Sequence, residues 1–300
     1  MNQSVITTQG LTKRFGSTVA LCDATIEIKE GSIVGLVGKN GAGKTTFIKL
    51  LCGLIRPTSG TFSILDGQRT ATSVAAIIEK STLYLGLNGY DNLVMQSKLL
   101  SLPIDESRIC DLLETVGLNP QNKSKAKDYS LGMKQRLAIA TALVGSPKLL
   151  ILDEPTNGLD PEGIVHMRNV LEKLNKEQGV TIIISSHILS ELSKLATDYV
   201  FLNKGKVIAC VSAAQLHKNT QKRTRFVLSD YTVAQIALAN FGSLEKGNGY
   251  LDLIGDVSAS TAIAALAAAG VEVLSVNTVG YDLENYFVEL LRENKEDANE

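Results

Sequence analysis

The sequence predicts an α/β fold with a parallel sheet at its centre, followed by a smaller α+β domain. Three short apolar runs, "SIVGLVG", "LLILD" and "TIIISSH", have the pattern of strands that are buried on both faces. Helix-like segments separate these runs, as connections between parallel strands require. A polar and basic stretch, "HKNTQKRTR", ends this pattern, and a second alternation of strands and helices begins after it.

Length and composition agree with one large and one small domain. The chain has 300 residues, of which 44% are hydrophobic and 20% charged, as in ordinary soluble globular proteins. The net charge of −1 gives no electrostatic case for nucleic-acid binding. No secretory signal starts the chain, and no segment approaches the roughly 18 apolar residues of a membrane helix, so we expect a cytoplasmic protein. The four cysteines are far apart, and we expect buried, reduced thiols without metal or disulfide.

The predicted first domain covers residues 1–216. Residues 6–28 alternate between apolar and polar side chains, which predicts a flap of exposed antiparallel strands. A strand, a glycine-rich loop and a helix follow in "SIVGLVG" and "TTFIKLLCGL". Residues 90–145 favour a helical subdomain, and the parallel strands resume after it, with an amphipathic helix at 164–174 between them.

The predicted second domain covers residues 225–291, after a linker at 217–224. Its order is strand, helix, two strands around a turn at 247–249, alanine-rich helix, strand and helix, which fits a split βαβ sandwich. Leu283, Phe287 and Leu290 recur at helical spacing, which is more often core than a ligand site. We find no catalytic cluster here and expect an accessory or dimer-contact module. Residues 292–300 are predicted to be a disordered tail.

The segment "GKNGAGKT" matches G-x-x-x-x-G-K-[ST] and lies between a buried strand and a helix, where a phosphate-binding loop must lie. Glycines let backbone N–H groups turn inward, and together with the helix N-terminus they can cradle phosphates. The lysine would bridge the β- and γ-phosphates, and the threonine after it would bind Mg²⁺. The alternative is a chance glycine-rich turn, which the strand and helix on either side disfavour. The predicted nucleotide-binding residues are Gly38, Asn40, Gly41, Ala42, Gly43, Lys44, Thr45 and Thr46.

Two acids end the strand "LLILD", at the sheet edge where α/β proteins hold their ligands. We expect Asp153 to hold Mg²⁺ through water and Glu154 to accept a proton from the attacking water. The alternative for Glu154 is that it only caps a turn before Pro155. His187 ends another buried strand, so it should emerge at the same edge, where a neutral imidazole can hydrogen-bond the γ-phosphate.

With these motifs in place, the chain resembles the nucleotide-binding subunits of ATP-binding cassette (ABC) transporters. The resemblance covers about residues 4–215, with the motifs in family order: phosphate loop, "YSLGMKQR" signature, "LLILDEP", "GLD" and switch histidine. It implies a P-loop NTPase fold that binds ATP and Mg²⁺, with Phe15 stacking on adenine, although Phe15 packing inward is an alternative. It also implies γ-phosphate contacts from Ser130 and the backbone of Gly132, and a dimer interface at Asp160.

The resemblance further implies that ATP lies between two cassettes, each phosphate loop facing the signature of the other. One copy of each motif in this chain predicts a homodimer or a pair of cassettes, arranged head to tail. Closure on ATP and opening after hydrolysis would drive an integral membrane permease, so the protein would be peripheral at the inner face of the cell membrane. Leu131 and Met133 depart from the usual signature, but Ser130 and the Gly132 backbone remain, so we expect the signature to function.

A further departure is Glu79, where the family usually has glutamine at the end of a strand. A carboxylate only accepts hydrogen bonds and adds negative charge, so Glu79 is a candidate for the metal and the attacking water. The alternative is an exposed loop acid.

Glu79, the signature and "DLENYFVELL" resemble the bacitracin-resistance and lantibiotic-immunity branch of ABC exporters. A motor for peptide export is therefore favoured. The alternatives are an importer subunit, another exporter, or a soluble ABC ATPase that acts on ribosomes or nucleic acid. That last class tends to carry two cassettes or a long coiled-coil insertion, and this sequence has neither.

Overall fold

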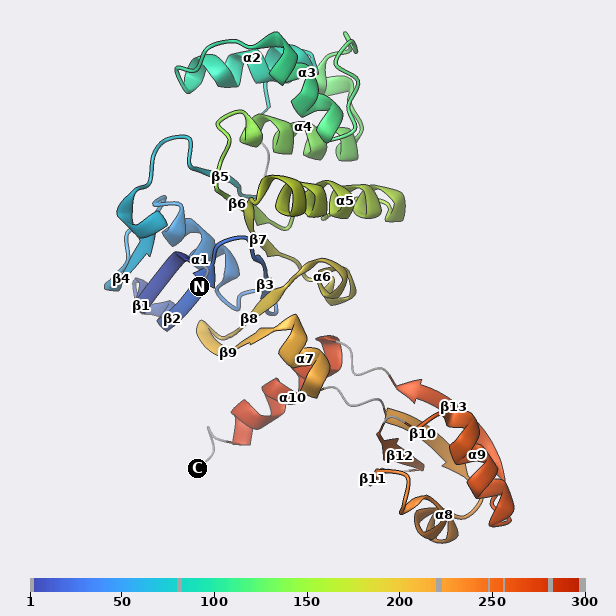
Figure 1. The fold of residues 1–300 in the computed structure, drawn as a ribbon. Helices are drawn as coiled ribbons and strands as arrows, with labels where there is room; N and C mark the ends of the chain where they lie inside the picture. Colours follow the sequence, from blue (N-terminus) through green and yellow to red (C-terminus); the bar gives the residue numbers. More distant parts are fainter. Residues whose placement is uncertain are drawn as a thin grey trace. The chain divides into compact units, whose positions relative to one another are not determined.

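The computed structural model describes residues 3–79, 83–219, 223–247, 249–255, 257–279 and 283–296. Contacts divide the chain into two units, Met1–Ser212 and Ala213–Glu300, each with its own sheet (Figure 1). The α/β fold with a smaller α+β domain is therefore confirmed. Within the described ranges, no helix combines the length and the apolar character that crossing a membrane requires.

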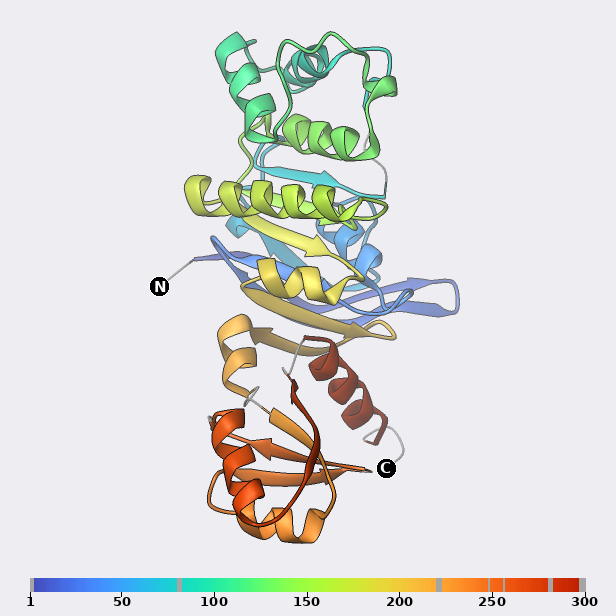
Figure 2. The same cartoon turned by 90° about the vertical axis from the view of Figure 1, so that its right-hand side faces the viewer.

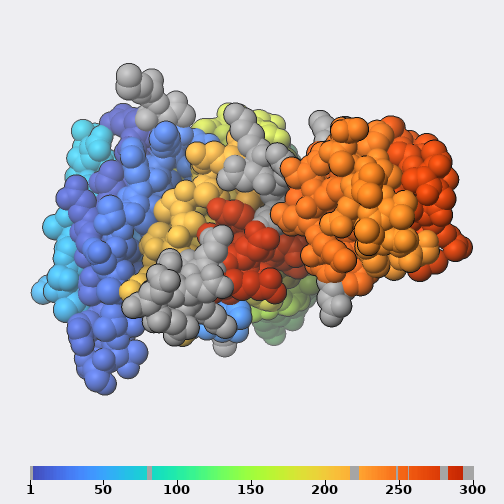
Figure 3. Space-filling view, turned by 90° about the horizontal axis from the view of Figure 1, so that it is seen from below, coloured from blue at the N-terminus to red at the C-terminus, as the bar shows by residue number. Residues whose placement is uncertain are grey.

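The described part of the first unit contains a nine-stranded sheet in the order β4-β1-β2-β9-β8-β3-β7-β6-β5. Its antiparallel side confirms the predicted flap, although the alternation pattern did not reveal that β4 joins it. The antiparallel strands are β1 (Ser4–Phe15), β2 (Thr18–Lys29) and β4 (Ser59–Ile64). The parallel strands are β3 (Ile33–Val37), β5 (Val74–Ile77), β6 (Leu149–Asp153), β7 (Thr181–Ser185) and β8 (Asp198–Asn203), and β9 (Lys206–Ser212) links the two sides. Figure 3 shows the N-terminal residues, in blue, along one edge of this unit.

Helix α1 (Lys44–Leu51) fills the space between the flap and the parallel strands. Phe47 and Ile48 are fully buried in one apolar cluster with Leu21 of the flap and Ile151 of the parallel sheet. Helices α5 (Pro161–Gln178) and α6 (Leu189–Leu195) cover the opposite face of the parallel strands (Figure 2). Because α1 belongs to both halves of the core, the residues at its N-terminus are held firmly.

The helical subdomain is confirmed at one end of the first unit (Figure 1). It contains α2 (Gly89–Leu99), α3 (Glu106–Thr115) and α4 (Leu131–Leu143), with a short 3-10 turn at Ala126–Asp128 before α4. Another 3-10 turn, Leu65–Gly67, follows β4. Each α-helix begins after a side chain that accepts a hydrogen bond from the third residue beyond it, namely Asn88, Asp105 and Ser130.

The second unit has the expected split βαβ order and an antiparallel sheet, β11-β12-β10-β13. Buried Phe226, Leu251 and Leu266 form one core between this sheet and its helices. On the other face, Arg225 makes two hydrogen bonds of 2.7 Å to the buried Asp252, which raises the pKa of the arginine. The elements are α7 (Ala213–Asn219), β10 (Arg223–Leu228), α8 (Tyr231–Leu238), β11 (Ser243–Gly247), β12 (Tyr250–Ile254), α9 (Ala259–Ala268), β13 (Val273–Val279) and α10 (Leu283–Glu296). Figure 3 shows β10 to α9, in orange, as one compact body.

Several expectations need correction. The linker predicted at 217–224 begins inside α7 and ends inside β10, because "AAQL" is a good helix-forming start and the basic residues after it suit a helix C-terminus. The predicted tail is helical to Glu296, since Arg, Glu and Lys there continue a helix; residues 297–300 lie outside the described residues. Leu283 and Phe287 are buried as expected, and Leu290 is partly buried. The cysteines are free, but they are not buried as predicted: Cys22, Cys52 and Cys110 are half-buried, and Cys210 is exposed because β9 is partly exposed along its whole length.

Replacing Phe47 tests the role of α1 in the core. Phe47→Ala should lower the free energy of unfolding by about 3–5 kcal/mol, because the cavity opens where the flap, helix and parallel strands meet. Urea denaturation of the full chain, followed by circular dichroism, measures this. Phe15→Ala is the matched control: that ring is 51% exposed, and its loss should change stability by less than about 0.5 kcal/mol. Equal losses of unfolding free energy in both variants would contradict the role of Phe47 as a central core residue.

Candidate functional site

The loop between β3 and α1 has a backbone that only glycine fits at two positions. A Cβ atom on Gly38 would lie 2.6 Å from the carbonyl oxygen of Leu202. Gly43 has a φ of +107°, and a Cβ there would lie 2.7 Å from the carbonyl oxygen of Ala20. Lys44 Nζ donates hydrogen bonds to the carbonyl oxygens of Gly38 (2.6 Å) and Lys39 (3.4 Å), so the lysine folds back over its own loop.

Asp153 joins this loop to the carboxyl ends of the parallel strands. The Thr45 hydroxyl donates to Asp153 Oδ2 at 2.9 Å, and the Ser185 hydroxyl donates to Oδ1 at 2.6 Å. The sheet register pairs Asp153 of β6 directly with Ser185 of β7, which explains the second bond. Sequence reasoning missed Ser185, although a polar residue ending the buried strand "TIIIS" was the available signal.

Glu154 and His187 meet at the same edge, as the sequence predicts. Glu154 has a left-handed φ of +53°, and its N–H donates to Ser185 Oγ at 2.9 Å. The carboxylate oxygen Oε2 lies 2.6 Å from His187 Nδ1, so this side chain bonds the imidazole and does not cap a turn. A carboxylate only accepts, so Nδ1 carries the proton. A neutral ring with its proton on Nδ1 has no second N–H to donate to a phosphate.

Glu79 follows β5 and forms an ion pair with Lys49 of α1, with Nζ and Oε1 2.7 Å apart. This hydrogen bond lowers the pKa of the Glu79 carboxyl below its ordinary value. Glu79 is exposed, as its alternative prediction required, yet it also lines a pocket of about 320 Å³ together with Asp153. Sequence reasoning did not identify Lys49, because its partner lies thirty residues away.

The signature segment begins α4 and contacts the "GLD" loop of its own chain. The exposed Ser130 caps the helix by accepting a hydrogen bond from the Met133 N–H at 3.2 Å. A Cβ atom on Gly158 would lie 2.9 Å from Leu131 Cδ2, so the leucine lies against a glycine. Gln135 Nε2 also donates to the Asn157 carbonyl oxygen at 3.1 Å.

The remaining predicted residues differ in exposure. Phe15 is 51% exposed at the end of β1, with Lys13 Nζ 5.0 Å from its ring centre, so the alternative of inward packing is wrong. Asp160 is exposed and caps α5 by accepting a hydrogen bond from the Gly163 N–H at 2.8 Å. Asn40 and Gly41 are exposed at the top of the loop, and Thr46 is partly exposed.

The residues present fit a nucleotide with Mg²⁺. Mg²⁺ prefers oxygen ligands and keeps several waters, and it commonly takes one carboxylate together with substrate phosphates. The hydroxyl of Thr45 and the carboxylate of Asp153 supply two such oxygens and already lie together. The glycine loop and Lys44 supply donors and positive charge beside them.

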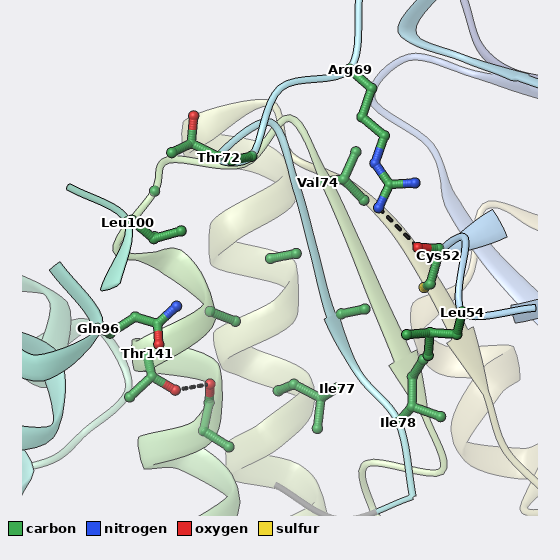
Figure 4. A pocket seen from close by; sticks show the side chains of 16 residues that line it. Cys52, Leu54, Arg69, Thr72, Val74, Ile77, Ile78, Gln96, Leu100 and Thr141 are labelled. Atoms are coloured by element: carbon green, nitrogen blue, oxygen red, sulfur yellow. Dashed lines mark hydrogen bonds between the residues drawn. The ribbon is translucent and has the colours of Figure 1, made fainter. Parts of the chain in front are cut away.

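A second, larger pocket of about 510 Å³ lies along β5, between the end of α1 and helices α2 and α4. Figure 4 shows Gln96, Leu100 and Thr141 on its helical side, with Cys52 and Arg69 across from them. Arg69 donates to the backbone carbonyl oxygen of Cys52 at 3.0 Å, and burial raises the pKa of the Cys52 thiol to about 11. The pocket therefore has a mixed apolar and polar lining.

One of the known proteins compared is similar to this chain along nearly its whole length. The family profile for ABC transporters matches residues 21–157. The chain is 36% identical to the bacitracin transport ATP-binding protein BcrA of Bacillus licheniformis over 299 residues, covering 96% of this chain and 97% of that protein. It is 46% identical to the lantibiotic transport ATP-binding protein SrtF of Streptococcus pyogenes over 204 residues, covering 67% of this chain and 87% of that protein.

A solved structure gives the same result for the fold. The structure of cbiO1 from Clostridium perfringens, described as part of an ABC transporter complex, superposes with a TM-score of 0.65 at 25% identity. It covers 73% of this chain and 92% of the cbiO1 chain. The chain therefore belongs to the ABC transporter family, as an ATP-binding ATPase subunit.

Proposed function

We propose that the chain is the motor of an exporter that removes membrane-active peptide antibiotics, of the bacitracin or lantibiotic kind, from a Gram-positive cell. The observation that carries this proposal is the extent of the likeness to a bacitracin transport ATP-binding protein. It covers 96% of the chain, so it includes most of the second unit as well as the cassette. Two chains, or this chain and a second cassette, would act together on a separate membrane permease at the inner face of the membrane.

The glycine loop and Lys44 would bind the phosphates of ATP. Lys44 now contacts neutral carbonyl oxygens of its own loop, and a phosphate would offer it a full negative charge in exchange. The N–H groups at the start of α1 would add dipolar attraction. The exposed ring of Phe15 is available for the adenine face.

Thr45 and Asp153 are the proposed Mg²⁺ ligands, with Glu79 as a further carboxylate that can reach the same pocket. Bound Mg²⁺ would neutralise charge on the phosphates. Glu154 would accept the proton of the attacking water, because it directly follows Asp153 at the end of β6. The 2.6 Å contact with His187 would hold Glu154 in place during this step.

The signature would act on the nucleotide of the partner cassette. Ser130 is exposed at the N-terminus of α4, where its hydroxyl and the helix dipole both favour an anion. The backbone of Gly132 would add a donor. Asp160 would lie at the interface between the two cassettes, where its cap of α5 fixes the shape of the loop.

The permease would dock in the larger pocket along β5. The exposed Leu54 is among the residues that line this pocket. The other lining residues come both from β5 of the parallel sheet and from helices α2 and α4 of the helical subdomain. A segment seated there would contact the strand that leads to Glu79 (Figure 4). Movement at the nucleotide could thus be passed to the membrane partner through β5.

Removing the base tests the proposed function directly. Glu154→Gln should reduce the rate of ATP hydrolysis by at least about 100-fold while ATP still binds, because the amide cannot accept the proton. Phosphate release and ATP binding of the purified chain measure the two properties. In a deletion strain, the wild-type gene with its permease should restore growth in bacitracin or a lantibiotic, and Glu154→Gln should not. Hydrolysis that persists in the variant, or resistance that is independent of it, would contradict the proposal.

Ser185 should matter because it holds both acids. Ser185→Ala removes the donor to Asp153 Oδ1 and the acceptor of the Glu154 N–H, so we expect a loss of about 10- to 100-fold in the rate of ATP hydrolysis or in Mg²⁺ affinity. The rate is measured as a function of Mg²⁺ concentration. Ser186→Ala is the matched control, since that neighbouring serine is also buried but accepts its hydrogen bond from the Ile188 N–H. Equal losses of hydrolysis rate or Mg²⁺ affinity in both variants would show that Ser185 has no specific role in the site.

Ser130→Ala tests the signature in the partner cassette. The variant should lose ATP-driven dimerisation, measured by light scattering with Glu154→Gln as background, because the hydroxyl that faces the partner nucleotide is gone. Loss of the helix cap alone costs about 1 kcal/mol of stability. Ser258→Ala removes an equivalent cap from α9 in the second unit and should leave dimerisation unchanged. Unchanged dimerisation in Ser130→Ala would refute the role.

A further inference from the structure

Lys49 has a position that the proposed mechanism does not yet use. It lies four residues after Thr45 on α1, so both side chains project from the same face of that helix. Thr45 bonds Asp153 at 2.9 Å, and Lys49 bonds Glu79 at 2.7 Å. One helix face therefore contacts two carboxylates, one at each of two successive turns.

The metal position is assembled without Glu79. Both oxygens of Asp153 already have partners, Thr45 and Ser185, from two different elements. Glu79 lines the same pocket as Asp153, but its carboxylate is bonded to Lys49. Its backbone has a left-handed φ of +60°, a conformation that few non-glycine residues adopt.

Charge explains why a partner is needed at Glu79. Asp153 and Glu154 already put two carboxylates at the end of β6, and ATP would bring more negative charge. A third carboxylate nearby is repelled unless a cation or a metal compensates it. Lys49 supplies this cation from the helix that also carries Lys44 and Thr45.

We propose that Lys49 is a positioning residue, which holds the Glu79 carboxylate one helical turn away from Thr45 and thereby limits how readily Glu79 joins the metal. This inference rests on the proposed Mg²⁺ site. The side chains of Lys49 and Glu79 are 34% and 64% exposed, so water screens their attraction and the pair exchanges easily. The Lys49–Glu79 ion pair is therefore weak, and removing it should change metal affinity by about two- to fivefold.

The test measures metal binding separately from hydrolysis. Mn²⁺, a spectroscopic substitute for Mg²⁺, is titrated into the full-length protein with ATPγS, and free Mn²⁺ is followed by electron paramagnetic resonance. Lys49→Met should tighten Mn²⁺ binding by about two- to fivefold, because Glu79 is released towards the metal. With Glu79→Gln as background, the same change should have no effect. Lys49→Arg, which keeps the ion pair, should restore the wild-type value.

The control and the opposing outcomes are equally specific. Lys176→Met breaks another exposed ion pair, with Glu172 on α5, and should leave Mn²⁺ binding unchanged. Melting curves establish that each variant is folded. Unchanged or weaker Mn²⁺ binding in Lys49→Met would overturn the inference, as would an equal change with and without Glu79→Gln. Failure of the proposed function would look different: wild-type protein would not bind Mn²⁺ with ATPγS, or Glu154→Gln would still hydrolyse ATP.

Discussion

The structure of the site depends on the two hydrogen bonds accepted by Asp153. One comes from Thr45 on α1 and the other from Ser185 on β7, so a single buried carboxylate ties together the phosphate loop helix and two parallel strands. Ser185 in turn accepts from the Glu154 N–H, and Glu154 contacts His187. A buried carboxylate without such partners would be costly. The same bonds that make Asp153 tolerable in the core also set the positions of the groups around the proposed metal.

Much of this arrangement follows from local sequence. The apolar runs that end in Asp153 and His187 had to be parallel strands, and parallel strands bring their carboxyl ends to one edge. The glycine pattern fixed the loop, because Gly38 and Gly43 tolerate no Cβ atom. Lys49 and Ser185 were not identified in this way, although Ser185 is a polar residue that ends a buried strand. Their partners lie thirty or more residues away, and neither residue type is unusual on a helix or at a strand end. Only the folded register makes them neighbours.

Local sequence was also insufficient to predict where helices α7 and α10 end. Polar, charged residues after Leu216 and after Leu291 look like linker or tail, but they are also good formers of exposed helix. Composition alone does not distinguish a solvated helix from a disordered segment when no apolar stripe is present. The edge strand β4 was missed for the related reason that its residues are largely exposed and show little alternation.

Two of the departures in the motifs, Leu131 and Glu79, have different physical consequences. Leu131 is a large side chain, but it lies against Gly158, which has no side chain, so it fits there without a clash. Steric fit of this kind leaves the charge of the site unchanged. Glu79 adds a charge, and a charge acts over a longer range than a methyl group. Its compensation must therefore also be a charge, and Lys49 provides one from the helix that bears the phosphate-binding lysine. The negative charge of Glu79 is thus compensated by Lys49 of α1, the helix that the Thr45–Asp153 hydrogen bond holds in position.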